Sequence, residues 1–140
     1  MGKRKNCLWK MLWERDLLKI KIMSTKKIWD YWEVVAIKYL QSKWYIIETT
    51  NFKFGKFWEV DIIAQKEGIT VFVEVKYRVW EKFWTPEEAI TKPKLRKFRR
   101  TIDFYCVKNN ISFENIRFDV IAIIKKATSN QVTHYRNVEI

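Results

Sequence analysis

Two runs of alternating side chains, joined by the dipeptide Glu67-Gly68, constrain the fold more than any other part of this sequence. The runs, Glu59–Gln65 and Ile69–Arg78, are rich in β-branched and aromatic residues, which favours strands. A short polar turn ending in glycine between two such runs is typical of a β-hairpin. If the loop has two residues, Lys66 pairs with Ile69, and this register fixes every other pair in the hairpin.

The register predicts that two carboxylates, Asp61 and Glu74, lie opposite each other across the hairpin. Alternation along the second strand puts Lys76 on the same face as Glu74. The Cβ atoms of facing residues are about 5 Å apart, and two facing carboxylates destabilise a sheet unless a partner neutralises them. We expect a hard divalent cation, Mg²⁺ or Mn²⁺, because magnesium is commonly held by one or two carboxylates with waters and phosphate oxygens.

A cross-strand ion pair is the structural alternative for the same residues. The register also places Glu59 opposite Lys76, and such a pair needs no catalytic meaning. In a chain with 31% charged residues, the hairpin pattern alone leaves both interpretations open.

Helical spacing of apolar residues predicts a helix from Ile28 to Leu40, with Glu33 in its first half. After the hairpin, the capping-box pattern 85–88 begins a second helix, which Pro93 restarts or kinks before an apolar stripe continues toward Asn109. The remaining strands are predicted over Tyr45–Thr50, Phe118–Ile124 and Val132–Val138. This order predicts an α/β domain around a mixed sheet, with the hairpin at its centre.

The length of 140 residues favours a single domain, which we expect over residues 23–140. Residues 1–22 show no firm period and form an extension of uncertain role, with Met23 as a candidate start. The net charge of +12 and the pI of about 9.7 indicate a polyanion as partner, and nucleic acid is the first to consider. The cations gather in the second helix: Lys92, Lys94, Arg96, Lys97, Arg99 and Arg100.

The two cysteines, Cys7 and Cys106, form neither a metal-spaced pair nor a disulfide framework, which favours a reducing cytoplasm. We expect Cys106 to be a buried free thiol. No apolar run reaches the roughly 18 to 20 residues that span a bilayer, and the basic start lacks an apolar stretch with a cleavage site, so neither a membrane anchor nor export is expected.

The segments Trp58–Ala64 and Val71–Lys76 resemble the YraN family of uncharacterised bacterial proteins, which is similar to the PD-(D/E)XK nuclease superfamily. The resemblance runs from about Trp29 to Asn137 and includes Glu33, Asn51, Arg78, Lys94 and Arg117-Phe118-Asp119. The intervals from Glu33 to Asp61 and on to Glu74 also resemble those of archaeal Holliday-junction resolvases. A restriction-endonuclease-like fold is what this resemblance implies.

The same resemblance implies roles for individual residues. Glu33, Asp61 and Glu74 would ligate magnesium, and Lys76 would orient the attacking water and stabilise the charge on the scissile phosphate. The residues expected to contact phosphates are Arg78, Lys94, Arg96, Lys97, Arg99 and Arg100. We therefore expect a magnesium-dependent endonuclease acting on DNA, branched or single-stranded, and by analogy a homodimer.

Two alternatives from other classes stay open. The first is a nucleic-acid-binding module that keeps this fold without turnover. The second is a protein-interaction domain in which Glu59 and Lys76 form a structural pair; this alternative predicts that nucleic-acid binding is absent or insensitive to salt.

The chain departs from the family at Trp29, Trp32, Trp44, Trp58 and Trp84, which stand where the family has glycine. Only three glycines occur in the whole chain. Our hypothesis is that the five codons are UGA from a lineage that reads UGA as glycine, translated here as tryptophan; UGG at these positions would contradict it. Taken at face value, the tryptophans are core residues or, less favoured, platforms on which single-stranded bases stack.

Three polar residues near the C-terminus have ordinary structural interpretations. His134, the only histidine, is expected at the surface or at a strand edge rather than as a general base. Arg117 and Asp119 alternate on a strand and are expected to form a structural ion pair.

Overall fold

The computed structural model describes residues 25–78 and 92–139, and the side chains of 25–29 and Arg78 lie outside that description. The extension 1–22, the capping box 85–88, Trp84 and the side chain of Trp29 therefore lie outside the described residues. The chain divides into two units, residues 1–31 and 32–140. Of the first unit only the beginning of a helix is described, and all packing reported below belongs to the second.

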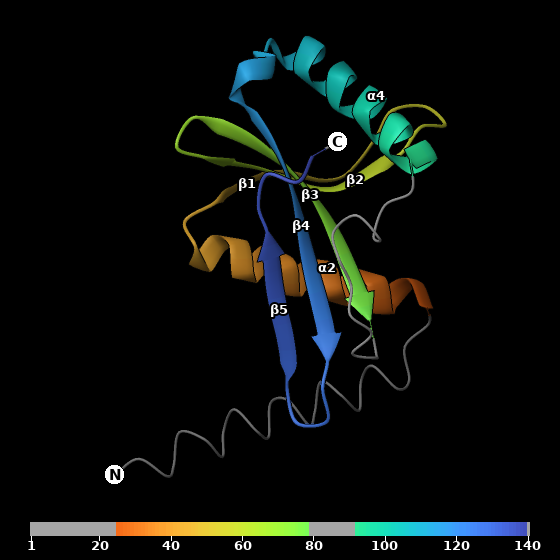
Figure 1. Ribbon diagram of the computed structural model, residues 1–140, viewed down its shortest axis with the longest axis vertical. Helices are drawn as coiled ribbons and strands as arrows, with labels where there is room; N and C mark the ends of the chain where they lie inside the picture. Colours follow the sequence, from red (N-terminus) through yellow and green to blue (C-terminus); the bar gives the residue numbers. More distant parts are fainter. Residues whose placement is uncertain (1–24, 79–91, 140) are drawn as a thin grey trace. The chain divides into compact units, whose positions relative to one another are not determined.

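A five-stranded sheet forms the centre of the second unit, with its strands in chain order (Figure 1). Strands β3 and β4 are parallel, and all other neighbours are antiparallel. The elements are α2 (Thr25–Ser42), β1 (Ile46–Lys53), β2 (Glu59–Lys66), β3 (Ile69–Arg78), α4 (Lys92–Asn109), a short 3-10 helix (Phe113–Asn115), β4 (Ile116–Lys125) and β5 (Asn130–Tyr135). The expected α/β domain with a mixed sheet is thus confirmed, and it is consistent with a restriction-endonuclease-like fold.

The predicted hairpin register is confirmed. Lys66 pairs with Ile69, and the pairing continues without a shift to Ile62 and Val73. Glu67 and Gly68 have φ values of 52° and 78°, the positive pair that a tight two-residue loop of type I′ requires. Local turn chemistry therefore sets which side chains of the two strands face each other.

Helices cover both faces of the sheet. On one face Phe98 and Tyr105 of α4 pack against Phe72, and on the other Trp32 of α2 stacks on Tyr77 with 4.0 Å between ring centroids. The middle of β3 is consequently buried on both sides, which explains its nearly continuous apolar sequence. None of the described helices is long and apolar enough to cross a membrane.

The buried thiol is also confirmed. Cys106 of α4 is a fully buried free cysteine. Burial, and next the negative charge of Asp103, raise the pKa of its thiol to about 11. The thiol therefore stays protonated and packs as a small apolar group.

Helix α2 ends in a backbone conformation that favours glycine, yet the residue there is Trp44. The Trp44 N–H donates to the Gln41 carbonyl and the Tyr45 N–H to the Leu40 carbonyl, each at 3.1 Å, which is the Schellman pattern. Trp44 has a φ of 67° and is 86% exposed, so its ring gains little burial in return. The expectation that Trp44 fills the core is wrong because the chain turns outward here, whereas Trp32 is fully buried as expected.

Replacing Trp44 by glycine is expected to stabilise the protein by about 1 kcal/mol, because glycine adopts positive φ without a Cβ clash. Thermal unfolding followed by circular dichroism would show this as a rise of a few degrees in Tm. Trp44→Ala is the matched control, since it removes the ring but keeps the Cβ. Equal Tm values for the glycine and alanine variants would contradict the conformational explanation.

Candidate active site

The candidate site lies where β2 and β3 separate. Regular backbone pairing of β2 with β3 ends at Ile62 and Val73. Beyond this pair, the Asp61 side chain takes the place of a β2 backbone carbonyl as hydrogen-bond acceptor. Its Oδ2 accepts a hydrogen bond from the Val75 backbone N–H at 2.7 Å. The Asp61 carboxylate is thereby held against β3 beside Glu74, the residue that the sequence register placed opposite it.

Glu74 is a buried carboxylate, 3% exposed, with two side-chain partners. Its Oε1 forms an ion pair with Nζ of Lys76, and its Oε2 accepts a hydrogen bond from Nε1 of Trp58 at 3.3 Å. Lys76 therefore lies on the same face as Glu74, as alternation along the strand predicted.

The alternative pairing of Glu59 with Lys76 does not form. Glu59 instead pairs with Lys53 of β1, with 2.9 Å between Nζ and Oε2. The reason is that Glu59 lies beyond the point where β2 leaves β3, while β2 continues to pair with β1 as far as Lys53 and Glu59. Lys76 pairs instead with Glu74, two positions earlier on its own strand.

The surroundings of Asp61 disfavour the ionised form of its carboxyl group. Burial, then the negative charge of Glu74, and less strongly that of Glu33, raise the pKa of Asp61 from its ordinary 3.8 to about 8. The hydrogen bond from Val75 and the charge of Lys76 oppose this rise without cancelling it. A cation bound here would favour the ionised carboxylate and remove the penalty.

Glu33 reaches the site from α2 but is not assembled with the other two carboxylates into one ligand set. Its Oε2 accepts a hydrogen bond from Nδ2 of Asn51 at 3.1 Å. Within the described residues no three side chains of His, Cys, Asp or Glu form a group close enough to hold a metal. The three-carboxylate set thus stays a prediction, while Asp61 and Glu74 still offer the one or two hard oxygen ligands that magnesium takes with water and phosphate.

The raised pKa of Asp61 predicts how stability depends on pH. A carboxyl group with a folded-state pKa of about 8 and an ordinary value of 3.8 binds more protons when folded, so its contribution to stability falls as pH rises from about 4 to about 8. Magnesium requires the ionised form, so added Mg²⁺ should raise Tm more at pH 8 than at pH 6. Melting curves with Mg²⁺ or with K⁺ at equal ionic strength, for the parent and Asp61→Asn, measure both effects. Identical pH profiles for the two proteins would contradict this account.

Trp58 occupies the space between the hairpin and α4. Its ring centroid lies 5.8 Å from Nζ of Lys76 and 5.2 Å from Nζ of Lys94, and its carbonyl accepts a hydrogen bond from Thr101 at 2.7 Å. The hydrogen bond from Nε1 to Glu74 was not predicted, because it joins residues 16 positions apart. Glycine at position 58 would remove both the ring and this bond.

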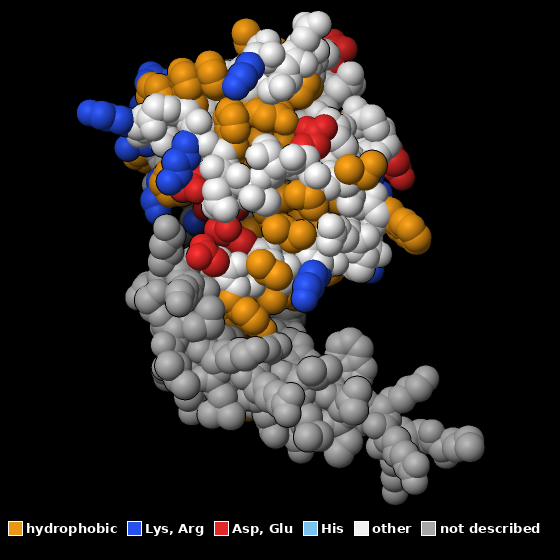
Figure 2. Space-filling model, turned by 180° about the vertical axis from the view of Figure 1, so that it is seen from behind, with side chains coloured by type: hydrophobic (Ala, Val, Ile, Leu, Met, Phe, Trp, Pro, Cys, Tyr) orange, Lys and Arg blue, Asp and Glu red, His pale blue; other side chains and the backbone are white. Residues whose placement is uncertain are grey.

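Five basic residues of α4 lie in three different surroundings. Lys94 lies over Trp58, while Arg96, Lys97 and Arg100 line a hollow with Pro93. Arg99 lines a different cavity, and its predicted phosphate contact stays a prediction. The side chain of Arg78, at the end of β3, falls outside the described part of the chain. Figure 2 shows a group of Lys and Arg side chains along one edge of the described surface, with Asp and Glu side chains directly beside it.

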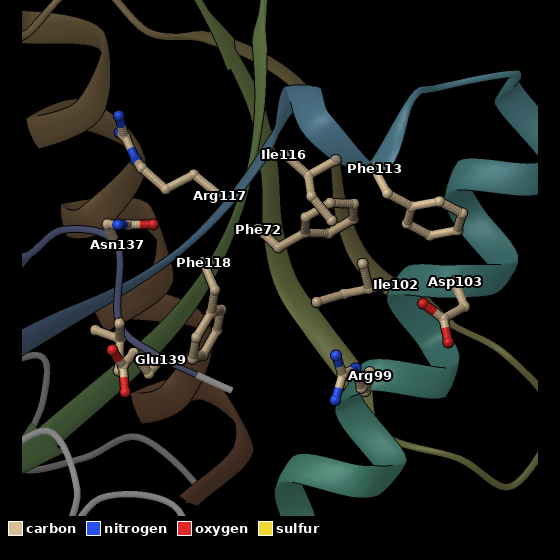
Figure 3. A pocket seen from close by; sticks show the side chains of 11 residues that line it. Phe72, Arg99, Ile102, Asp103, Phe113, Ile116, Arg117, Phe118, Asn137 and Glu139 are labelled. Atoms are coloured by element: carbon tan, nitrogen blue, oxygen red, sulfur yellow. The ribbon is translucent and has the colours of Figure 1, made fainter.

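The cavity that Arg99 lines has a volume of about 400 Å³ and lies between α4, β4 and the segment 137–139 (Figure 3). Arg99 and Asp103 of α4 line it together with Phe72 and Phe118. Neither Asp61 nor Glu74 is among its lining residues. Its walls come from separate parts of the chain, so no local sequence pattern predicts it.

A buried polar network joins β4, β5 and the segment after β5. Asp119, fully buried, accepts hydrogen bonds from Nε of Arg117 at 2.8 Å, Nε2 of His134 at 2.7 Å and the backbone N–H of Asn137 at 3.0 Å. Burial alone would raise the pKa of Asp119, but these bonds outweigh it and lower the pKa. The structural ion pair is confirmed, and so is the strand-edge position of His134, although its side chain is only 3% exposed.

Comparison with known proteins finds relatives over most of the described chain. Residues 32–123 match a family described as "Uncharacterised protein family UPF0102". The UPF0102 protein of Sulfurihydrogenibium sp. (strain YO3AOP1) is 38% identical over 107 residues, which cover 76% of this chain and 89% of that protein. The corresponding protein of Clostridioides difficile (strain 630) is 41% identical over 72% of this chain and 88% of its own length. That of Carboxydothermus hydrogenoformans is 34% identical over 83% and 98%.

Proposed function

This chain belongs to the uncharacterised protein family UPF0102, and we propose that it is a magnesium-dependent nuclease that hydrolyses phosphodiester bonds in DNA. The observation that carries the proposal is the pair of carboxylates Asp61 and Glu74, with Lys76 beside them, at the point where two strands part. Burial and the negative charge of Glu74 raise the pKa of Asp61 to about 8, and a bound cation would favour its ionised form.

In this proposal Asp61 and Glu74 hold magnesium, with Glu33 as the third carboxylate nearby. Magnesium, when bound, supplies an acidified water and neutralises charge on the phosphate. Lys76 donates hydrogen bonds through an ammonium group that already lies against Glu74, and it stabilises the negative charge that develops on the scissile phosphate. The Val75 N–H holds one oxygen of the Asp61 carboxylate in place beside Glu74.

Binding of the DNA backbone is assigned to Lys94, Arg96, Lys97 and Arg100 of α4. Contacts from such side chains to phosphates position a nucleic acid without reading its sequence, and they weaken steeply as salt rises. The net charge of +12 supports attraction of a polyanion to this surface.

The second candidate is a nucleic-acid-binding module without turnover, and one observation favours it. Trp58 donates a hydrogen bond to Glu74 while Lys76 pairs with the other oxygen, so both oxygens of this carboxylate already have partners. A metal must replace at least one of them. The Trp58→Gly variant, which frees Oε2, is therefore tested beside the parent.

A cleavage assay separates the two candidates. Branched, flapped, single-stranded and duplex DNA are incubated with the protein in Mg²⁺ or in EDTA. We expect cleavage only with Mg²⁺, and a loss of about 100-fold or more in Glu74→Gln. Glu59→Gln is the control and should cleave like the parent, because Glu59, on β2 of the same hairpin, pairs with Lys53. If neither the parent nor Trp58→Gly cleaves any substrate while both bind DNA, the enzyme assignment fails and the binding module stands.

A further inference from the structure

A hollow walled by aromatic rings lies beside the basic residues of α4. Phe54 and Phe57 come from the loop between β1 and β2, and Phe104 comes from α4. The ring centroids of Phe54 and Phe104 are 3.9 Å apart and nearly parallel, and those of Phe54 and Phe57 are 5.4 Å apart. This aromatic hollow measures about 440 Å³, and Arg100, Asp103 and Val107 complete its lining.

The aromatic hollow is open at the surface and held in place by its backbone. Val107 is 75% exposed, and the three phenylalanines are only partly buried. The Phe57 N–H donates to the Phe54 carbonyl at 3.0 Å, and Gly55 between them has a φ of 56°. This turn fixes the two rings relative to each other before any ligand arrives.

Arg100 connects the aromatic hollow with a second, basic hollow, lined by Pro93, Arg96, Lys97 and Arg100 itself. Its guanidinium lies 5.2 Å from the ring centroid of Phe57. The lining residues of α4, at positions 93, 96, 97, 100, 103, 104 and 107, recur on each turn of the helix, so they form a continuous stripe along one side of it. Along this stripe, from the N-terminal toward the C-terminal end of α4, the cationic side chains are followed by the aromatic rings.

We propose that the two hollows together bind a single-stranded stretch of DNA. The phosphates contact Arg96, Lys97 and Arg100, and an unpaired base stacks against the rings of the aromatic hollow. This deepens the nuclease proposal, on which it rests for the choice of DNA, by assigning a substrate class that contains unpaired bases.

The chemistry of a single strand fits both hollows. A single strand presents anionic groups and exposed base faces side by side, whereas a duplex hides the base faces within its stack. Asp103 lines the aromatic hollow and repels a phosphate there, but its carboxylate accepts hydrogen bonds from the N–H groups of a base. A second copy of the chain could cover the rings, yet it would bring a net charge of +12 to the cations of the basic hollow.

The test measures binding in EDTA, so that cleavage plays no part. Fluorescence anisotropy of a labelled oligothymidine and of a labelled duplex is recorded for the parent, Phe57→Leu and Phe57→Trp. Because stacking contributes about 1–3 kcal/mol per base, Phe57→Leu should weaken single-strand binding by about 5-fold or more and change duplex binding little. Phe57→Trp keeps an aromatic face and should retain binding. Phe113→Leu, a phenylalanine 56% exposed in the 3-10 helix, is the matched control and should bind like the parent.

The outcomes keep this proposal separate from the nuclease assignment. Preferential single-strand binding that depends on the ring at position 57 supports it even if no DNA is cleaved. Equal single-strand binding by the parent and Phe57→Leu overturns it even if Mg²⁺-dependent cleavage is found. A change in oligomeric state of Phe57→Leu by size-exclusion chromatography, with single-strand binding unchanged, assigns the aromatic hollow to a second copy and also overturns it.

Discussion

Replacing Asp61 by asparagine is expected to abolish magnesium-dependent cleavage and, in the same protein, to raise stability. Asparagine keeps an oxygen that accepts the Val75 N–H but carries no charge for a metal, so we expect cleavage to fall by about 1,000-fold. Stability rises because the variant no longer has to bury a carboxyl group beside Glu74 and Glu33, two neighbours that raise its pKa. A gain of about 1–2 kcal/mol at pH 7 is the size usually found when a strained functional group is removed.

The opposite directions of the two effects distinguish a catalytic residue from a structural one. Single-turnover cleavage with excess protein gives the first effect, and urea unfolding gives the second. Asp30→Asn, an exposed aspartate of α2, should change neither quantity. If Asp61→Asn instead loses stability together with activity, Asp61 supports the hairpin and the metal assignment is wrong.

The hairpin could be predicted from sequence because local chemistry determines it. Glu67 and Gly68 select a tight turn, and the turn fixes the register as far as Ile62 and Val73. The next pair, Asp61 with Glu74, was predicted to face across a regular ladder, but the ladder ends there and Asp61 bonds to the Val75 backbone. The divergence follows from contacts outside the hairpin, since β2 continues along β1, whose register is itself interrupted between Ile47 and Thr49.

The remaining differences from the sequence predictions arise where distant segments meet. The sequence predicted that the cations gather in this helix but not that Arg99 lines a cavity with the segment 137–139. The bond between Trp58 and Glu74 spans 16 positions and depends on how the β1–β2 loop returns to the sheet. His134 was expected at the surface or at a strand edge. It lies on the edge strand β5, but its ring is buried against Tyr39 and Tyr45 and bonds to Asp119, 15 positions earlier. Periodicity predicts the face of an element and not the partner that covers it.

The exposed Trp44 and the ring of Trp58 bear on the recoding hypothesis from two independent directions. Trp44 holds a positive φ that costs a residue with a side chain about 1–2 kcal/mol, and Trp58 donates a hydrogen bond to a carboxylate of the candidate site. Glycine would relieve the strain at the first position and free a ligand oxygen at the second. Trp32 differs, since it is fully buried against Tyr77, and its replacement would leave a cavity in the core. The codons at these three positions are therefore the decisive observation for the hypothesis.

Replacing Asp119 by alanine is expected to destabilise the protein by about 3–5 kcal/mol, because it leaves Arg117 and His134 facing a buried site without their acceptor. Asp119→Asn keeps the acceptor oxygens in part and should cost less. Urea unfolding at pH 7 measures both. The folded-state pKa of Asp119 lies below its ordinary value of 3.8. The contribution of Asp119 to the free energy of unfolding is therefore complete above pH 3.8 and is lost as the pH falls further. The difference in stability between the parent and the variant should accordingly shrink in acid. A cost below about 1 kcal/mol would mean that the network contributes little.

Asp119→Asn should leave the cleavage rate of each folded molecule unchanged. Asp119 pairs with Val73 across the parallel strands β3 and β4, next to the pair of Glu74 with Val120, so it stabilises the strand that carries the site without touching Asp61 or Glu74. We expect cleavage by Asp119→Asn to fall only with the fraction of folded protein, and conditions that restore folding should restore the full rate. A loss of rate in fully folded Asp119→Asn would show that the network also positions Glu74. Asp61→Asn should show the reverse behaviour, with a folded and more stable protein that does not cleave.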